Sequence, residues 1–218
     1  MSTNIVSSTE VTKSGHFISF EGIDGAGKSS HIAWLAEQFV ENGITVTSSR
    51  EPGGTPLGEK LRDIILNDEM EAPTEALLAF AARQENILKV IQPALDNGNW
   101  VLCDRFTDST FAYQGYGRGF SLEKLAELER WVHAGLQPTL TIIFDCPPQI
   151  AAQRLADSRV ADKFERQSLE FFTRVREGYL ARAAQYPQRY VVINSNQSME
   201  AVRASLSPLV TRLLTQEK

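Results

Sequence analysis

The chain comprises 218 residues, of which 42% are hydrophobic, and this length and composition predict one large α/β domain with a sizeable core. The formal net charge of −5 argues against a general nucleic-acid-binding protein or a membrane-surface protein. Basic groups that hold a phosphate ligand must therefore be concentrated locally.

The two cysteines and the N-terminal residues indicate the cellular compartment. Cys103 and Cys146 each lie in an apolar run, which predicts buried free thiols rather than a disulfide or a metal site, and hence a reducing cytoplasm. No apolar stretch approaches about 18 residues, and residues 1–15 lack the charged-then-apolar order of a signal peptide. We expect a disordered Ser/Thr-rich tail at 1–15 and a single domain at 16–218.

The first predicted strand, 17–21, leads into the most specific motif of the chain. The residues that follow read Gly-Ile-Asp-Gly-Ala-Gly-Lys-Ser up to Ser29, and this order between a strand and a helix predicts a phosphate-binding P-loop. The glycines let backbone N–H groups surround an anion where a Cβ would block the approach. Lys28 is expected to reach the β- and γ-phosphates, and Ser29 to hold Mg²⁺. The residues expected to bind the nucleotide are Gly22, Ile23, Asp24, Gly25, Ala26, Gly27, Lys28, Ser29 and Ser30.

Helical and strand-like patterns alternate along the rest of the chain. Apolar residues recur at helical spacing from Ile32 to Val40 and from Leu57 to Ile65. Further helices are predicted at 74–96, 121–134, 147–156, 166–184 and 198–214, and further strands at 44–49, 100–104, 140–145 and 189–194. This alternation predicts a five-stranded parallel sheet with helices on both faces, the α/β architecture of P-loop NTPases. Because ligands of such sheets bind at the carboxyl ends of the strands, four residues are expected to border one crevice: Glu21, Arg50, Asp104 and Asp145.

Two segments at the ends of strands narrow the function, since a P-loop alone is compatible with GTPases, transport ATPases and small-molecule kinases. The second strand is followed by Arg-Glu-Pro-Gly-Gly-Thr, residues 50–55, a charged pair on a rigid turn. The third strand ends in Asp104-Arg105-Phe106, and a helix that carries Ser109, Tyr113 and Gln114 is expected after it.

These segments together resemble bacterial thymidylate kinases (dTMP kinases). The P-loop, the 50–55 turn, Phe80-Ala81-Ala82-Arg83, the Asp-Arg pair and Ala112-Tyr113-Gln114 occur in this order in that family, and the resemblance runs from about Gly15 to the C-terminal helix. It implies an enzyme that moves the γ-phosphoryl group of ATP to dTMP with Mg²⁺ as cofactor. It also implies a homodimer, for which the apolar faces of helices at 57–66, 74–96 and 107–114 offer an interface.

The resemblance assigns the residues around the phosphates. Asp24 would contact the 3′-hydroxyl of the acceptor sugar and help to order Mg²⁺. Arg105 would grip the acceptor phosphate. From its position at the end of a strand beside the P-loop, and not from the resemblance, we expect Asp104 to orient Lys28 or a metal-bound water, and a structural salt bridge is the alternative. The predicted metal-binding residues are Ser29 and Asp104.

The resemblance also assigns the acceptor pocket. Phe80 would stack on thymine, and Arg83 would bind the O4 side of the pyrimidine. Tyr113 would lie under the deoxyribose, where its ring would clash with a 2′-hydroxyl. The remaining substrate-binding residues are Glu51, Ser109 and Gln114. For Tyr179 we favour packing in the core over a place in this pocket.

A basic cluster lies between the fourth strand and the next long helix, at Arg154, Arg159, Lys163 and Arg166. It resembles the mobile lid of the family, at about 150–166. The P-loop has no basic residue before Lys28, and in such enzymes the lid supplies the cations for the transferring group. Lys163 stands where the family usually has arginine, so we expect Arg154 or Arg159 to make the contact in the transition state. The catalytic set is therefore Lys28, Arg105, Asp24, Arg154 and Arg159. The loop from Asn194 to Gln197 is expected on the adenine side by position alone.

Two other functions stay open at this stage. One is a kinase for another nucleoside or nucleoside monophosphate, which its acceptor would distinguish. The other is a GTPase-like switch, against which stands the lack of an Asn-Lys-x-Asp segment for reading guanine.

Overall fold

The fold is built on a parallel sheet that brings the ends of its strands to one edge. The computed structural model describes residues 15–156, 163–164 and 167–216. In the described chain the strands are β1 (Phe17–Glu21), β2 (Val46–Arg50), β3 (Trp100–Asp104), β4 (Leu140–Asp145) and β5 (Tyr190–Asn194). They form a five-stranded sheet of order β2-β3-β1-β4-β5, and every neighbouring pair is parallel. The predicted sheet is confirmed, with β2 starting two residues later than the apolar run at 44–49 indicated.

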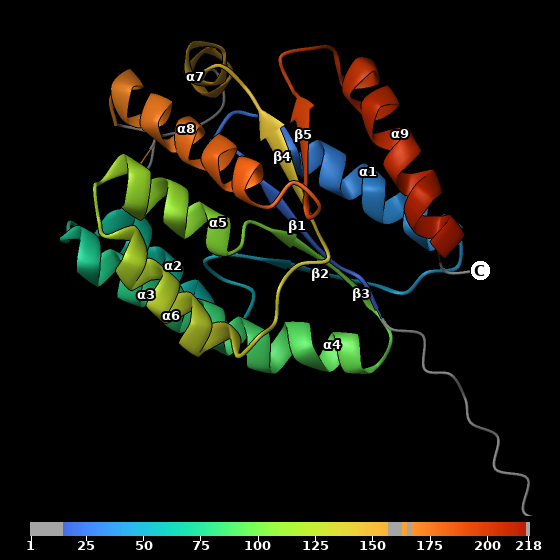
Figure 1. Cartoon of the computed structure of the whole chain (residues 1–218), viewed down its shortest axis with the longest axis horizontal. Coiled ribbons are helices and arrows are strands. Elements are labelled where there is room, and N and C mark those ends of the chain that lie inside the picture. Colours follow the sequence, from blue (N-terminus) through green and yellow to red (C-terminus); the bar gives the residue numbers. More distant parts are fainter. Residues whose placement is uncertain (1–14, 157–162, 165–166, 217–218) are drawn as a thin grey trace, which may run out of the picture.

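Helices cover both faces of this sheet. They are α1 (Lys28–Glu41), α2 (Pro56–Asn67), α3 (Ala72–Asn86), η1 (Ile87–Ile91), α4 (Gln92–Asp96), α5 (Thr107–Thr110), η2 (Phe111–Gly117), α6 (Leu122–His133), α7 (Pro148–Ala156), α8 (Leu169–Gln185) and α9 (Met199–Gln216). Figure 1 shows α1 and α9 on one side of the sheet and α5, α6 and α8 on the other. The helix predicted at 74–96 contains a π-helical turn, η1, which sequence periodicity does not reveal.

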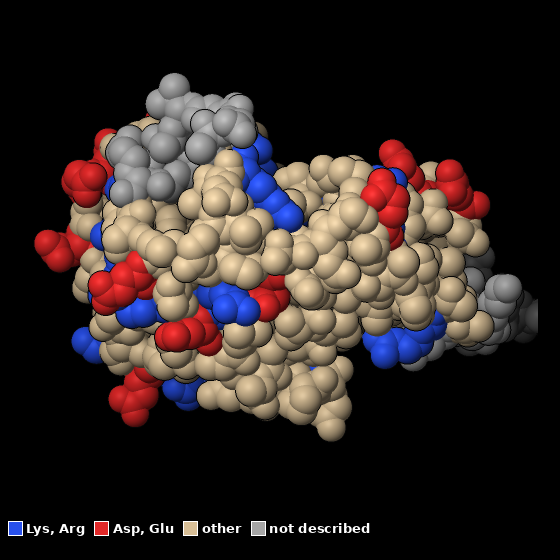
Figure 2. Space-filling view, turned by 90° about the horizontal axis from the view of Figure 1, so that it is seen from above, with Lys and Arg blue, Asp and Glu red and all other residues tan. Residues whose placement is uncertain are grey.

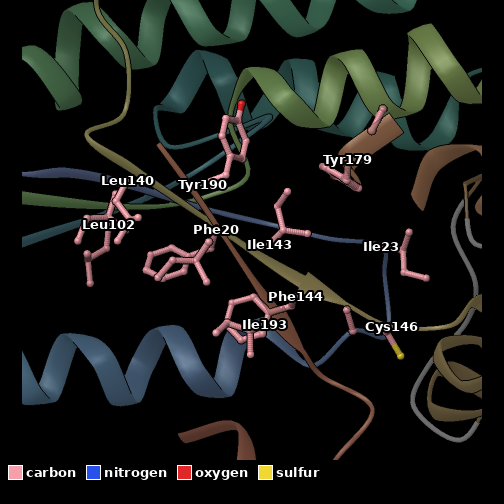
Figure 3. Close-up of a cluster of buried hydrophobic side chains, with 14 of the residues drawn as sticks. Phe20, Ile23, Leu102, Leu140, Ile143, Phe144, Cys146, Tyr179, Tyr190 and Ile193 are labelled. Carbon is pink, nitrogen blue, oxygen red and sulfur yellow. The ribbon is translucent and has the colours of Figure 1, made fainter. Parts of the chain in front are cut away.

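Side chains that alternate along the strands build a separate core on each face. Phe20 and Leu102 face α1, while Phe17 and Val101 belong to a second cluster with residues of α3, η1 and α6. Figure 3 shows the first cluster, which gathers aromatic and aliphatic side chains from β1, β3, β4 and β5. The rigid sheet thereby positions the loops that follow β1, β2 and β3.

The surface mixes charges of both signs. Figure 2 shows acidic and basic residues next to one another over one face of the molecule. Within the described part of the chain, no helix is long and apolar enough to cross a membrane.

Candidate active site

The P-loop connects β1 to α1 and depends on close backbone contacts. A Cβ on Gly22 would lie 2.5 Å from the carbonyl oxygen of Phe144, and one on Gly25 would lie 2.3 Å from that of Ala151, so a larger residue at either position would displace backbone. Gly27 adopts a φ of 84° directly before α1. The predicted strand, loop and helix context of the motif is therefore present.

Lys28 is the buried cation of this loop. Its Nζ donates to the carbonyl oxygens of Gly22 at 3.0 Å and Ile23 at 3.3 Å. Burial, with a further contribution from nearby Arg105, lowers the pKa of Lys28 to about 8. The ammonium group therefore stays mostly protonated at neutral pH, and ligand phosphates beside it would raise its pKa again.

Two cavities open where the strands end. The first, here named the P-loop cavity, has a volume of about 460 Å³, and the second, the inner cavity, one of about 80 Å³. The P-loop cavity is lined by residues of the loop and of the neighbouring strand ends: Asp24, Gly25, Gly27, Lys28, Ser29, Ser30, Arg50, Glu51, Arg62, Asp104, Arg105 and Leu155. Ile23 and Ala26 are buried in the core, so they contribute backbone rather than side chains to the loop.

The four strand-end residues do not all border one crevice, as the sequence led us to expect. Arg50 and Asp104 line the P-loop cavity. Glu21 is fully buried, and Asp145 pairs with Arg176 at 2.6 Å. Strand position alone therefore predicted the correct edge of the sheet, but the neighbouring side chains decide which groups reach the cavity.

Four residues line both cavities: Asp24, Glu51, Arg62 and Arg105. Arg62 was not expected from the sequence. It lies on α2, where its Nη1 donates to the carbonyl oxygen of Pro52 at 3.0 Å. Helical spacing marks only the apolar side of α2, so no local signal singles out this arginine.

Arg105 lies at the junction of the cavities in a strained backbone conformation. Its φ of 68° is in the left-handed region, which is unfavourable for a residue with a side chain. Two hydrogen bonds hold this turn, one from the Arg105 amide to the Phe20 carbonyl at 2.9 Å and one from the Phe106 amide to Glu21 Oε1 at 2.7 Å. The backbone thereby aims the guanidinium between the cavities.

The guanidinium of Arg105 donates hydrogen bonds to three residues predicted to bind the acceptor nucleotide and to Tyr179. Its Nη2 donates to Asp24 Oδ1 at 2.7 Å and to the hydroxyl of Tyr113 at 3.1 Å. Its Nη1 donates to Ser109 at 3.1 Å and to the hydroxyl of Tyr179 at 2.8 Å. Burial alone would raise the pKa of Asp24, but Arg105 and Lys28 outweigh it and hold that pKa well below its usual range.

Tyr179 and Glu21 belong to the hydrogen-bond network around Arg105. We favoured core packing for Tyr179, and its ring is indeed buried, yet its hydroxyl bonds both Arg105 and Ser109. Ser109 donates in turn to Glu21 at 2.6 Å. Burial, and then the nearby carboxylate of Asp108, raise the pKa of Glu21 to about 8. Glu21 therefore binds a proton more readily in the folded chain than in the unfolded chain.

Arg83 forms a buried ion pair with Glu51 at the wall of the inner cavity. Arg83 Nε lies 2.7 Å from Glu51 Oε2, and both side chains are 2% exposed. Asn86 donates to the other oxygen of Glu51 at 3.0 Å, and Arg83 Nη2 donates to Thr110 at 3.0 Å. Arg83 Nη1 is buried and has no hydrogen-bond partner among the described residues. Because buried donors normally have a partner, this unpaired donor on a residue that lines the cavity needs an explanation.

The structure packs Phe80 in the core, and its expected stacking on thymine stays a prediction. Phe80 is 2% exposed and belongs to the core cluster on its face of the sheet, where Arg83 lies over its ring at 4.6 Å. Ala79, one position earlier, lines the inner cavity instead. One residue along a helix turns the side chain by about 100°, so a shift of one position exchanges a cavity wall for the core.

Two aromatic rings and an amide complete the inner cavity. Tyr113 and Phe164 meet edge to face with ring centroids 5.5 Å apart, and both line the cavity. Gln114 also lines it and donates to Glu75 Oε1 at 2.7 Å. Phe164 and Glu75 were not among the predicted site residues, because their roles depend on contacts between distant segments.

Asp104 and Ser29 lie on the same cavity and fit a hard cation. Both line the P-loop cavity, and Asp104 Oδ1 is buried with no hydrogen-bond partner among the described residues. An unpaired carboxylate oxygen and a hydroxyl are ligands that Mg²⁺ prefers. The described residues contain no group of three or more His, Cys, Asp or Glu side chains placed to hold a metal ion by themselves.

The predicted lid is described only in part. Arg154, near the end of α7, donates to the carbonyl oxygens of Ser195 at 3.1 Å and Gly25 at 3.5 Å, so it lies between the P-loop and the loop after β5. Arg159 and Arg166 lie outside the described residues. Lys163 is buried on the other side of the site, and it is absent from the lining of the P-loop cavity.

Comparison with known proteins decides the family. The thymidylate kinase family description matches residues 20–206. This chain belongs to the thymidylate kinase family. The thymidylate kinase of Ralstonia pickettii is 56% identical over 203 residues, which cover 91% of this chain and 99% of that protein. The thymidylate kinase of Methylobacillus flagellatus is 57% identical over 189 residues, covering 87% and 93%.

A solved thymidylate kinase structure agrees with the fold. The crystal structure of thymidylate kinase from Ehrlichia chaffeensis superimposes with a TM-score of 0.73 at 33% identity, covering 90% of this chain and 98% of that one. The family resemblance and the P-loop kinase fold that the sequence indicated are both confirmed.

Proposed function

We propose that this thymidylate kinase transfers the γ-phosphoryl group of ATP to dTMP to give dTDP, with the ATP phosphates in the P-loop cavity and dTMP in the inner cavity. One observation carries the assignment of the two sites: Asp24, Arg62 and Arg105 line both cavities. An acceptor phosphate held at these residues lies next to a donor phosphate held by the P-loop. This is the placement that an in-line transfer requires.

Catalysis in this arrangement is mainly positioning and charge neutralisation. Lys28 faces the donor phosphates, and Arg105 and Arg62 face the acceptor phosphate. Their positive charges reduce the repulsion between the two anions as they approach. They also stabilise the negative charge of the loose, metaphosphate-like transition state. The reaction needs no side-chain nucleophile, because the acceptor phosphate itself attacks.

Mg²⁺ would be held by Ser29 and Asp104, whose free carboxylate oxygen supports this role. When bound, the ion would neutralise charge on the phosphate oxygens. Asp104 also lies close enough to Lys28 to favour its protonated form. Whether Asp104 binds Mg²⁺ or pairs with Lys28, its negative charge offsets a positive charge in the P-loop cavity.

Thymidine recognition would use the wall of the inner cavity. The free Nη1 of Arg83 would donate to the O4 side of the base, and Gln114 and Ser109 would lie beside it. Tyr113 would lie under the deoxyribose, and Asp24 would accept from the 3′-hydroxyl. Phe80 would stack on the base, as the family resemblance implies, and Ala79 would form the cavity wall next to it in sequence.

A homodimer is proposed on the face of α3 and α6. Leu77 and Trp131 are 56% and 76% exposed there and flank a groove that also includes Phe120 and Leu128. Exposed aromatic and aliphatic side chains at one place favour an interface between subunits. A cytoplasmic location likewise stays a prediction.

A panel of acceptors tests the proposed reaction. Purified protein with ATP and Mg²⁺ should phosphorylate dTMP best among dTMP, dUMP, UMP, CMP and AMP. A preference of about tenfold for UMP, CMP or AMP would overturn the assignment of the acceptor. Tight GTP binding with slow turnover and no acceptor would instead favour the GTPase-like switch.

A further inference from the structure

A buried ion pair joins the Lys163–Phe164 turn to α3, the helix whose Ala79 and Arg83 line the inner cavity. Lys163 Nζ lies 2.9 Å from Glu75 Oε2, and the two side chains are 1% and 0% exposed. The same Nζ donates to the carbonyl oxygen of Asp68 at 2.7 Å. The Lys163 amide donates to the carbonyl oxygen of Leu66 at 3.3 Å, so backbone and side chain attach to one surface formed by α2 and α3.

Glu75 connects this attachment to the inner cavity. Its Oε1 accepts from Gln114 Nε2 at 2.7 Å, and Arg118 Nε lies 3.3 Å from the same oxygen. One carboxylate therefore fixes both the Lys163 ammonium and a side chain that lines the cavity. A fully buried carboxylate needs such partners, because an unpaired charge in this position is costly.

Phe164 is the part of this turn that reaches the cavity. Its ring packs edge to face on Tyr113 at 5.5 Å and lines the inner cavity, while Lys163 Nζ and Arg118 lie over the ring at 5.3 and 5.7 Å. Phe164 therefore forms part of the wall that a nucleotide in the inner cavity would contact.

We propose that Lys163 is a positioning residue for the acceptor site, not a cation for the transition state. Its ion pair with Glu75 holds Phe164 as a wall of the inner cavity and keeps Gln114 in place, so the pair determines the affinity for the nucleoside monophosphate. This proposal rests on the proposed binding of dTMP in the inner cavity. It also explains why a lysine suffices at this position, because the charge pairs with a carboxylate rather than with the planar face of a phosphate.

Steady-state kinetics of Lys163→Met and Phe164→Ala test the proposal, with Lys163→Arg as the matched control that keeps the charge. We expect Lys163→Met and Phe164→Ala each to raise the KM for dTMP about tenfold, with kcat within about threefold and the KM for ATP unchanged. Lys163→Arg should retain most of the affinity. The KM for dTMP of the double variant should not exceed the higher KM of the two single variants, because both substitutions remove the same wall.

Other results would refute the proposal. A fall of kcat by about tenfold in Lys163→Met with an unchanged KM for dTMP would make the lysine a transition-state cation. Additive effects on the KM for dTMP in the double variant would show that the ion pair and Phe164 act independently. Phe164→Ala leaves the ion pair intact and stays informative if Lys163→Met does not fold. A wild-type protein that does not use dTMP would contradict the proposed function itself, and the acceptor panel detects this first.

Discussion

Replacing Arg83 by methionine should destabilise the protein strongly, because its ion pair with Glu51 is buried. The side chains are 2% exposed and 2.7 Å apart, so the substitution leaves the carboxylate with Asn86 as its remaining side-chain partner. Breaking such a pair costs about 3–5 kcal/mol. For a domain of this size each kcal/mol shifts Tm by roughly 2–4 °C, so Tm should fall by about 6–20 °C.

A second substitution separates the buried charge from lost packing. Burial already raises the pKa of Glu51, and Arg83 is the main group that opposes this rise, so in Arg83→Met the carboxyl should bind a proton more readily. Glu51→Gln/Arg83→Met has no buried charge and should recover most of the lost stability in urea unfolding followed by circular dichroism. A loss below about 1 kcal/mol in the single variant, or a less stable double variant, would refute this reasoning.

The same double variant tests the role of Arg83 in binding. With stability restored, the free Nη1 donor is still missing, and a hydrogen bond from a charged donor contributes about 1.5–3 kcal/mol. Because Glu51 also lines both cavities, Glu51→Gln alone is the reference, and the KM for dTMP of the double variant should stay roughly 10- to 150-fold above the value for Glu51→Gln in a coupled kinase assay. A normal KM in a stable double variant would show that Arg83 supports the fold alone.

Three further predictions concern the phosphate site, the sugar and pH. Lys28→Ala should lower turnover by at least about two orders of magnitude with an unchanged circular dichroism spectrum, and near wild-type activity would remove Lys28 from the P-loop mechanism. Tyr113→Ala should raise the ratio of ribonucleotide to deoxyribonucleotide use, and an unchanged ratio with lower activity would assign the ring to packing alone. The pKa of Glu21 is raised from 4.5 to about 8 on folding, so the folded chain binds the extra proton and stability should fall as pH rises through this window. Glu21→Gln should flatten this pH dependence of Tm, and an equally steep dependence would place the proton on another group.

The sequence by itself determined the features that depend on neighbouring residues. The P-loop is a continuous segment whose glycine positions and flanking patterns are local properties, and its predicted strand, turn and helix are present. The strands at 17–21, 100–104 and 140–145 have the predicted bounds. Strand and helix alternation then left a parallel sheet as the consistent arrangement.

Tertiary structure decided which side chains meet. Ala79 lines the inner cavity while Phe80 packs in the core, because the rotation of the helix, not residue type, selects which side chain faces the cavity. Arg62 reaches the junction of the cavities from α2. Lys163 carries the charge that the family pattern predicts for a lid, yet it pairs with Glu75, a residue distant in sequence, because both lie where the turn packs on α3. Residue type predicts the chemistry that a side chain can perform, but its partner depends on how distant segments pack together.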